Sequence, residues 1–121
     1  MTQDWSVDFT LTRREVQAWL RHVQGRTATV ELGPRTISLE VLGMRIGSPQ
    51  ANRLVLWTAF KPLQEDADHF FLPFAPSGVV ILPRLAFACY AEAELFRQEF
   101  ERRRCKPWEI AYAHGNLALR S

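Results

Sequence analysis

The segment from Thr36 to Phe60 constrains the fold of this chain more than any other, because it is the longest stretch rich in apolar and β-branched residues. It predicts two long strands joined by a turn over Gly47–Asn52, where glycine, serine, proline and asparagine gather. Along the first strand the apolar residues alternate with polar ones, but the alternation changes face beside Gly43. Such a change predicts a β-bulge or a sharp bend, and strands that bend in this way are typical of small barrels.

The second strand of this pair, Leu54–Phe60, carries apolar residues on both of its faces. We therefore expect a central strand that is covered on both sides, either by the helices of the chain itself or by a partner chain. The residues that would form such an interface are Val55, Trp57, Phe70, Phe71 and Phe74. A large core beneath two helices explains the same residues equally well, so both interpretations stay open.

Two helices are predicted to flank the strands. Thr12 followed by Glu15 forms a capping box, which predicts an N-terminal helix over residues 12–24 or so. A longer C-terminal helix is expected over residues 85–105 or so, with acidic residues early and basic residues late, as the helix dipole favours. Within it, Glu99 and Arg103 are spaced for an i, i+4 ion pair.

Shorter strands are predicted over residues 26–32, 69–74 and 79–82, and Pro73 favours an edge position for the second of them. The chain is expected to form a single domain over residues 1–121, with a β core over about 26–83 and an extended tail over 106–121. The predicted fold class is α+β. It consists of a strongly bent antiparallel sheet, or a small open barrel, of about five strands, with the two helices beside it.

The composition indicates a folded protein with a core of its own, since 47% of the 121 residues are hydrophobic. A net charge of +2 is too small to indicate a nucleic-acid partner by itself. The sequence contains neither a secretory signal at its start nor an apolar run long enough to cross a bilayer, so we expect a cytoplasmic protein without membrane contact. Cys89 and Cys105 are then expected to be reduced thiols, and Cys89, among small and aromatic residues, is expected to be buried.

The order of these elements resembles the Sm-like fold, in which a helix precedes a small antiparallel barrel. The resemblance covers residues 12–86 and is carried by four stretches: Val30–Leu32, Ile37–Arg45, Arg53–Ala59 and Val79–Pro83. It implies a ring assembled through edge strands, with single-stranded RNA bound along loops at the pore. The family motifs themselves are not matched. Asn52 has no aspartate beside it, and Leu82-Pro83-Arg84 stands where a basic residue and a glycine are expected, so the RNA-contact residues do not carry over.

A basic cluster at the end of the second helix is the best candidate for a functional surface. It consists of Arg102, Arg103, Arg104 and Lys106, with Trp108 close behind. Clustered cations neutralise phosphates, and an aromatic ring stacks on a base, so the cluster suits single-stranded nucleic acid. A solvated helix end is the simpler interpretation of the same residues.

Catalytic and metal sites are not recognisable in the sequence. Glu65, Asp66, Asp68 and His69 have the chemistry of metal ligands, but a solvated loop explains them better. Cys89 has no histidine at a spacing that indicates a catalytic pair. No cofactor is expected.

Two functions follow from these observations. The first is a non-enzymatic binding module that forms a homo-oligomer and binds single-stranded nucleic acid. The alternative is a protein-interaction or accessory subunit that does not bind nucleic acid. The sequence favours the first without excluding the second.

Overall fold

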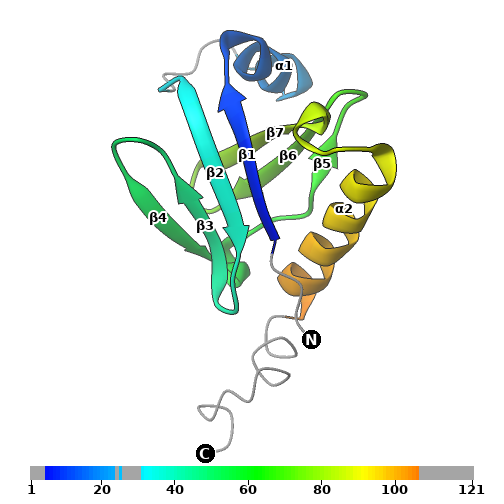
Figure 1. The fold of residues 1–121 in the computed structure, drawn as a ribbon. Helices are drawn as coiled ribbons and strands as arrows, with labels where there is room; N and C mark the ends of the chain where they lie inside the picture. Colours follow the sequence, from blue (N-terminus) through cyan, green and yellow to red (C-terminus); the bar gives the residue numbers. More distant parts are fainter. Residues whose placement is uncertain (1–4, 24, 26–30, 107–121) are drawn as a thin grey trace, which may run out of the picture.

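The protein is described by a computed structural model over residues 5–23, 25 and 31–106. Within these residues the strands form two antiparallel sheets, and two helices pack against them (Figure 1). The four-stranded sheet has the order β1-β2-β3-β4, formed by Trp5–Leu11, Gly33–Leu39, Gly43–Gly47 and Asn52–Leu56. The three-stranded sheet has the order β5-β6-β7, formed by Gln64–Glu65, His69–Phe74 and Gly78–Pro83. The helices are α1, Arg13–Val23, and α2, Tyr90–Cys105, with short 3-10 turns at Trp57–Ala59 and Arg84–Ala86.

The α+β class with antiparallel strands and two helices is confirmed. The finer prediction of a bent sheet or small open barrel of about five strands is not confirmed, because the described strands form two sheets and no closed barrel. Within the described residues, seven strands divide into two sheets, and an isolated bridge between Phe60 and Phe74 joins the segment after β4 to the second sheet. The inner faces of both sheets and one face of α2 enclose the main core. None of the described helices is long and apolar enough to span a bilayer.

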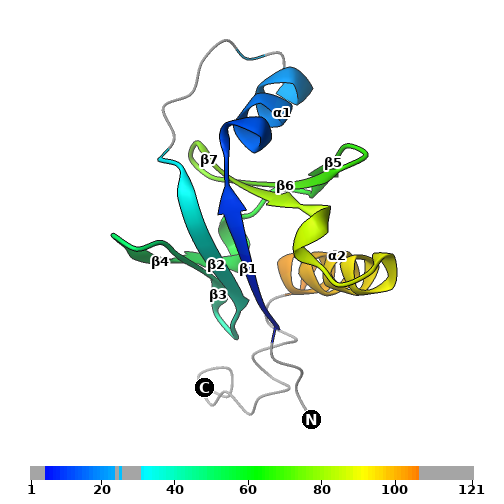
Figure 2. The same cartoon turned by 45° about the horizontal axis from the view of Figure 1, so that its top comes forward.

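Strand β6 is buried on both faces, because it lies between two apolar layers. Its residues alternate: Phe70, Leu72 and Phe74 enter the main core, while Phe71 enters a second cluster beneath α1. Figure 2 shows α1 on the face of the three-stranded sheet that points away from the four-stranded sheet. The predicted edge position of this strand is therefore wrong, since β6 is the centre of its sheet. Pro73 fits there because the short β5 pairs only with Phe70 and Phe71.

The doubly covered strand predicted over Leu54–Phe60 is also corrected. Strand β4 ends at Leu56 and is an edge strand, and the chain continues as a 3-10 turn. Leu56 is 52% exposed, whereas Val55 and Trp57 are buried. A short strand followed by a helical turn needs apolar residues at successive positions, and so does a strand that is covered on both sides. The sequence alone therefore does not distinguish the two structures.

The change of face beside Gly43 is a chain reversal and not a bulge. β2 ends at Leu39 and β3 begins at Gly43, and the backbone N–H of Glu40 donates to the carbonyl of Gly43 at 2.8 Å. A Cβ atom at Gly43 would overlap the carbonyl oxygen of Val55 on β4, so only glycine allows the strands to approach this closely. The segment from Thr36 to Phe60 therefore forms parts of three strands. The turn predicted over Gly47–Asn52 is confirmed, because these two residues pair across β3 and β4.

The helices differ from their predictions mainly at their ends. α1 begins directly after Thr12, whose backbone N–H donates to the Glu15 carboxylate at 3.0 Å, so this half of the predicted capping box is confirmed. The Glu15 N–H donates to the backbone carbonyl of Thr12 and not to its hydroxyl, which itself donates to Glu15. α2 begins at Tyr90 and not near residue 85. The strand predicted over 26–32 falls largely outside the described residues, and β2 begins at Gly33. The tail predicted over 106–121 lies outside them except for Lys106.

Candidate binding site

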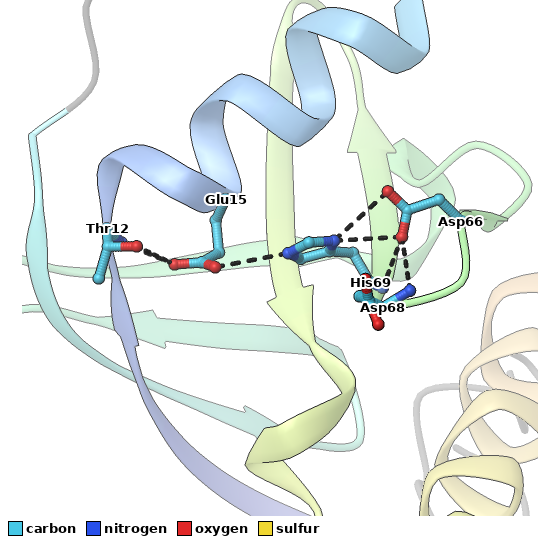
Figure 3. A network of polar contacts seen from close by, with 5 residues as sticks. All are labelled: Thr12, Glu15, Asp66, Asp68 and His69. Atoms are coloured by element: carbon cyan, nitrogen blue, oxygen red, sulfur yellow. Dashed lines mark hydrogen bonds and ion pairs between the residues drawn. The ribbon is translucent and has the colours of Figure 1, made fainter.

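A buried polar network joins the start of α1 to the start of β6 (Figure 3). The His69 ring lies between two carboxylates, with Nε2 at 3.4 Å from Glu15 Oε2 and Nδ1 at 3.1 Å from Asp66 Oδ1. The Asp66 Oδ1 atom also accepts the backbone N–H groups of Asp68 and His69, each at 2.8 Å. Both Glu15 and His69 are buried.

The network favours the ionised form of both carboxyl groups. Burial on its own raises the pKa of Glu15, but hydrogen bonds from Thr12 and the nearby His69 ring lower it by more, so this pKa lies below its ordinary value. Burial likewise raises the pKa of Asp66. Hydrogen bonds from the backbone of Asp68 and from His69 outweigh burial there as well, and the pKa of Asp66 is also lowered.

Both carboxylates that flank His69 have hydrogen-bond partners within the chain, and the network fastens α1 to the second sheet. Glu65, which the sequence placed in the same acidic cluster, pairs with Arg84 and with Arg97 Nε, the latter at 3.0 Å. Among the described residues, no group of histidine, cysteine and acidic side chains has the arrangement of a metal site. Cys89 is exposed at the N-cap of α2, which corrects the prediction that it is buried.

The basic cluster at the end of α2 is largely neutralised by the helix itself. Arg102 and Arg103 both pair with Glu99, with N–O distances of 2.7 and 2.5 Å, and the predicted i, i+4 pair is confirmed. Arg104 pairs with Glu101 at 2.7 Å. The Arg103 side chain is only 3% exposed and also donates to the carbonyl of Glu40 at 3.1 Å.

As a result, the cluster does not form one open cationic surface. Arg102 and Lys106 remain exposed at the helix end, and Trp108 lies outside the described residues. Nucleic-acid binding through this surface stays a prediction.

The five residues expected at a subunit interface are instead buried inside the chain. Val55, Trp57, Phe70, Phe71 and Phe74 all belong to the two core clusters. Two apolar layers within the chain already cover them, so they offer no exposed surface to a second subunit. Assembly into a homo-oligomer by other surfaces stays a prediction.

An apolar pocket lies at the end of the sandwich opposite to α2. Trp5, at the start of β1, packs edge-on against Phe96 of α2 with ring centroids 5.9 Å apart, whereas Phe9 and Leu11, at the other end of β1, line the pocket. The pocket has a volume of about 150 Å³. Its remaining apolar walls come from both sheets and are formed by Ile46, Phe74 and residues 79–81. Small-molecule sites in proteins are concave and mostly apolar in this way.

Two arginines, Arg35 on β2 and Arg53 on β4, line the same pocket. Each lies two residues before a buried residue, Ile37 or Val55, and therefore on the same strand face as that residue; Arg35 is half-buried there and Arg53 is exposed. Within residues 5–23, 25 and 31–106, no carboxylate lies within 4.0 Å of either guanidinium group. The pocket therefore combines apolar walls with two positive charges that no acidic side chain of the described chain neutralises.

The contacts of the two arginines are with neutral groups. Arg35 donates from Nη1 to the carbonyl of Pro34 at 3.0 Å and from Nη2 to the carbonyl of Glu31. The Cζ atom of Arg53 lies 5.1 Å from the centroid of the Phe74 ring, within the range of a cation–π contact. These contacts hold both side chains at the pocket and leave their charge uncompensated.

The chain was compared with protein-family models, with curated proteins and with solved structures. None of the three comparisons found a match. The candidate site therefore rests on its own geometry.

Sequence reasoning missed this pocket, although a signal for it exists. The signal is an arginine on the strand face that also carries buried apolar residues, which holds for Arg35 before Ile37 and for Arg53 before Val55. The register between β2, β3 and β4 has to be known before the two residues can be placed at one end of the sheet.

Proposed function

We propose that this protein is a non-enzymatic binding module whose site is the pocket lined by Phe9, Leu11 and residues 79–81. The strongest support is that the walls come from regular strands of both sheets, so the cavity is built on rigid elements. An apolar cavity of about this volume accommodates a ligand the size of benzene. The ligand is therefore a small molecule, or a small apolar group of a larger one.

The polar clusters of the described chain favour binding over catalysis. The buried His69 is held between two carboxylates, and the exposed Cys89 has no described side-chain hydrogen bond to a histidine. A general base needs a reacting group within hydrogen-bond reach. The two ring nitrogens of His69 contact carboxylates of the chain itself, so they join elements of the fold and do not face a reacting group.

Binding of small apolar molecules can be tested with methyl-labelled protein in NMR titrations, using hexanol as a neutral probe. We expect saturable shifts of the methyl groups of Ile46 and residues 79–81, and little change in the exposed Leu42. Val79→Phe places a ring at the pocket wall and should abolish the saturable shifts. Leu42→Phe, a change on an exposed side chain that does not line the pocket, should leave them intact. Shifts that do not saturate, or that persist in Val79→Phe, would remove the pocket as the site.

A further inference from the structure

We infer that the ligand of this pocket is a small monocarboxylate, with its apolar part in the cavity and its carboxylate between Arg35 and Arg53. The inference rests on the proposed function, since it assigns chemistry to the same cavity. Its basis is the pair of positive charges at an otherwise apolar site. Arg35 is half-buried and Arg53 is exposed, so an anion at the mouth of the pocket can reach both charges without competition from a carboxylate of the described chain.

The two guanidinium groups keep donors for a ligand. An arginine has five N–H donors, and Arg35 uses two of its nitrogens on backbone carbonyls of Pro34 and Glu31. Arg53 has a described contact with the face of Phe74 and no described hydrogen bond to a carboxylate. A carboxylate matches the fork of a guanidinium group and forms two parallel charge-assisted hydrogen bonds with it.

The surroundings of Arg35 suit a head group that stays in contact with water. Arg35 lines both the apolar pocket and a second, more open hollow of about 340 Å³. This hollow is lined by polar groups, including Thr36, Ser48 and Asn52. Arg35 therefore lies where the apolar pocket meets the open polar hollow. A ligand with one apolar and one charged end can place its apolar end in the pocket and keep its charged end in contact with water.

The size of the cavity limits the apolar part. A volume of about 150 Å³ holds a benzene-sized group or a short chain, but not a long acyl chain. Two arginines on strands that are not neighbours suit one anionic group better than the several charges of a nucleotide. Hexanoate is therefore a suitable probe, and hexanol and hexylamine are neutral and cationic probes with the same chain.

The test is a calorimetric titration of the three probes into the whole chain and into single variants. We expect hexanoate to bind at least about tenfold more tightly than hexanol, and hexylamine more weakly than either, because charge-assisted hydrogen bonds form only with the anion. Arg35→Gln and Arg53→Gln should each remove most of the preference for hexanoate and leave the affinity for hexanol unchanged. Arg14→Gln changes an exposed arginine of α1 away from the pocket and is the matched control. Circular dichroism confirms that each variant is folded, and Arg53→Lys, which keeps the charge, should retain part of the preference.

The outcomes separate the two proposals. Equal affinities for hexanoate and hexanol, both lost in Val79→Phe, would overturn the carboxylate inference and support the binding pocket. No saturable binding of any probe would overturn both. A preference for hexanoate that survives in both Arg→Gln variants would also overturn the inference, because the charge would then be recognised elsewhere.

Discussion

The guanidinium group of Arg103 donates from Nη1 to the backbone carbonyl of Glu40 at 3.1 Å. Arg103 lies near the end of α2, and Glu40 lies in the turn between β2 and β3, so one hydrogen bond joins the last helix to the first sheet. The same carbonyl accepts a second hydrogen bond from the indole Nε1 of Trp57 at 3.0 Å. Arg103 therefore acts as part of the core, and its charge is balanced by Glu99 at 2.5 Å.

Arg103→Leu should lower the free energy of unfolding by about 3 kcal/mol, because it leaves the partly buried Glu99 without its inner partner. Arg102→Leu removes the other partner of Glu99, but Arg102 is 48% exposed, so we expect a loss below about 1 kcal/mol. Urea denaturation of both variants measures the difference. Equal losses would contradict the distinction between a buried and an exposed ion pair.

The stability of the protein should fall in acid. The pKa of each of four carboxyl groups, Glu15, Glu65, Asp66 and Glu99, is lowered in the fold, because in each case hydrogen bonds and nearby positive charge outweigh the effect of burial. A carboxyl group whose pKa is lower in the folded state stabilises the fold above its unfolded pKa. This stabilisation is lost as the pH falls through the folded pKa.

Above the ordinary glutamate pKa of 4.5, the contribution of these four groups to the free energy of unfolding should be nearly constant. Below that pH their contribution should decrease. Urea denaturation from about pH 7 to about pH 3 tests this. Glu15→Gln removes one of the four contributions, so its stability should depend less steeply on pH in the acid range. A wild-type curve that is flat across the acid range would contradict the prediction.

The His69 ring should influence the ionisation of Glu15 directly. His69→Leu removes a hydrogen bond and a nearby positive charge that favour the Glu15 carboxylate, so the pKa of Glu15 should rise. The buried carboxylate keeps its hydrogen bonds from Thr12 but loses the one from His69, so the free energy of unfolding should also fall, by about 2 kcal/mol. NMR titration of the Glu15 carboxyl carbon measures the first effect.

His22→Ala is the control for this change. His22 is an exposed residue that lies beside Phe71 and contacts Gln64, and it has no described contact with Glu15. It should leave the pKa of Glu15 unaltered. A rise of similar size in both variants would mean that the effect comes from packing beneath α1 and not from the network.

Local signals in the sequence located several features correctly. Three of them depend on residues that lie close together in the chain: the hydrogen bond of Thr12 with Glu15, the turn over Gly47–Asn52 and the ion pair of Glu99 with Arg103. The interactions are local, so the spacing of a few residues is enough to specify them.

The remaining features depend on contacts between distant parts of the chain. A bulge and a turn both change the face of the apolar residues, and the pairing of β2 with β3, which places Leu39 opposite Met44, distinguishes them. The burial of β6 on both faces depends on α1, which packs against one of them. The sequence of β6 does not determine where α1 lies. Arg35 and Arg53 reach one pocket only through the register of three strands, so the candidate site could not be read from spacing.

The contact between Gly78 and Phe74 links the fold to the candidate site. These residues pair across β6 and β7, and the Phe74 ring covers Gly78, so a Cβ atom at this position would overlap the ring. Phe74 also lines the pocket and contacts Arg53. A side chain at Gly78 must therefore displace the ring that forms part of the pocket wall.

Gly78→Ala should lower the free energy of unfolding by about 1–3 kcal/mol, the usual cost of overpacking a core position. It should also shift the methyl resonances of the pocket residues Ile46 and Val80. Gly47→Ala is the matched control, since the nearest atom to a Cβ there is 3.7 Å away, an ordinary contact distance. We expect it to change stability by no more than about 0.5 kcal/mol. If Gly78→Ala proves as stable as Gly47→Ala and leaves the pocket resonances in place, Phe74 does not occupy the space above Gly78 in solution.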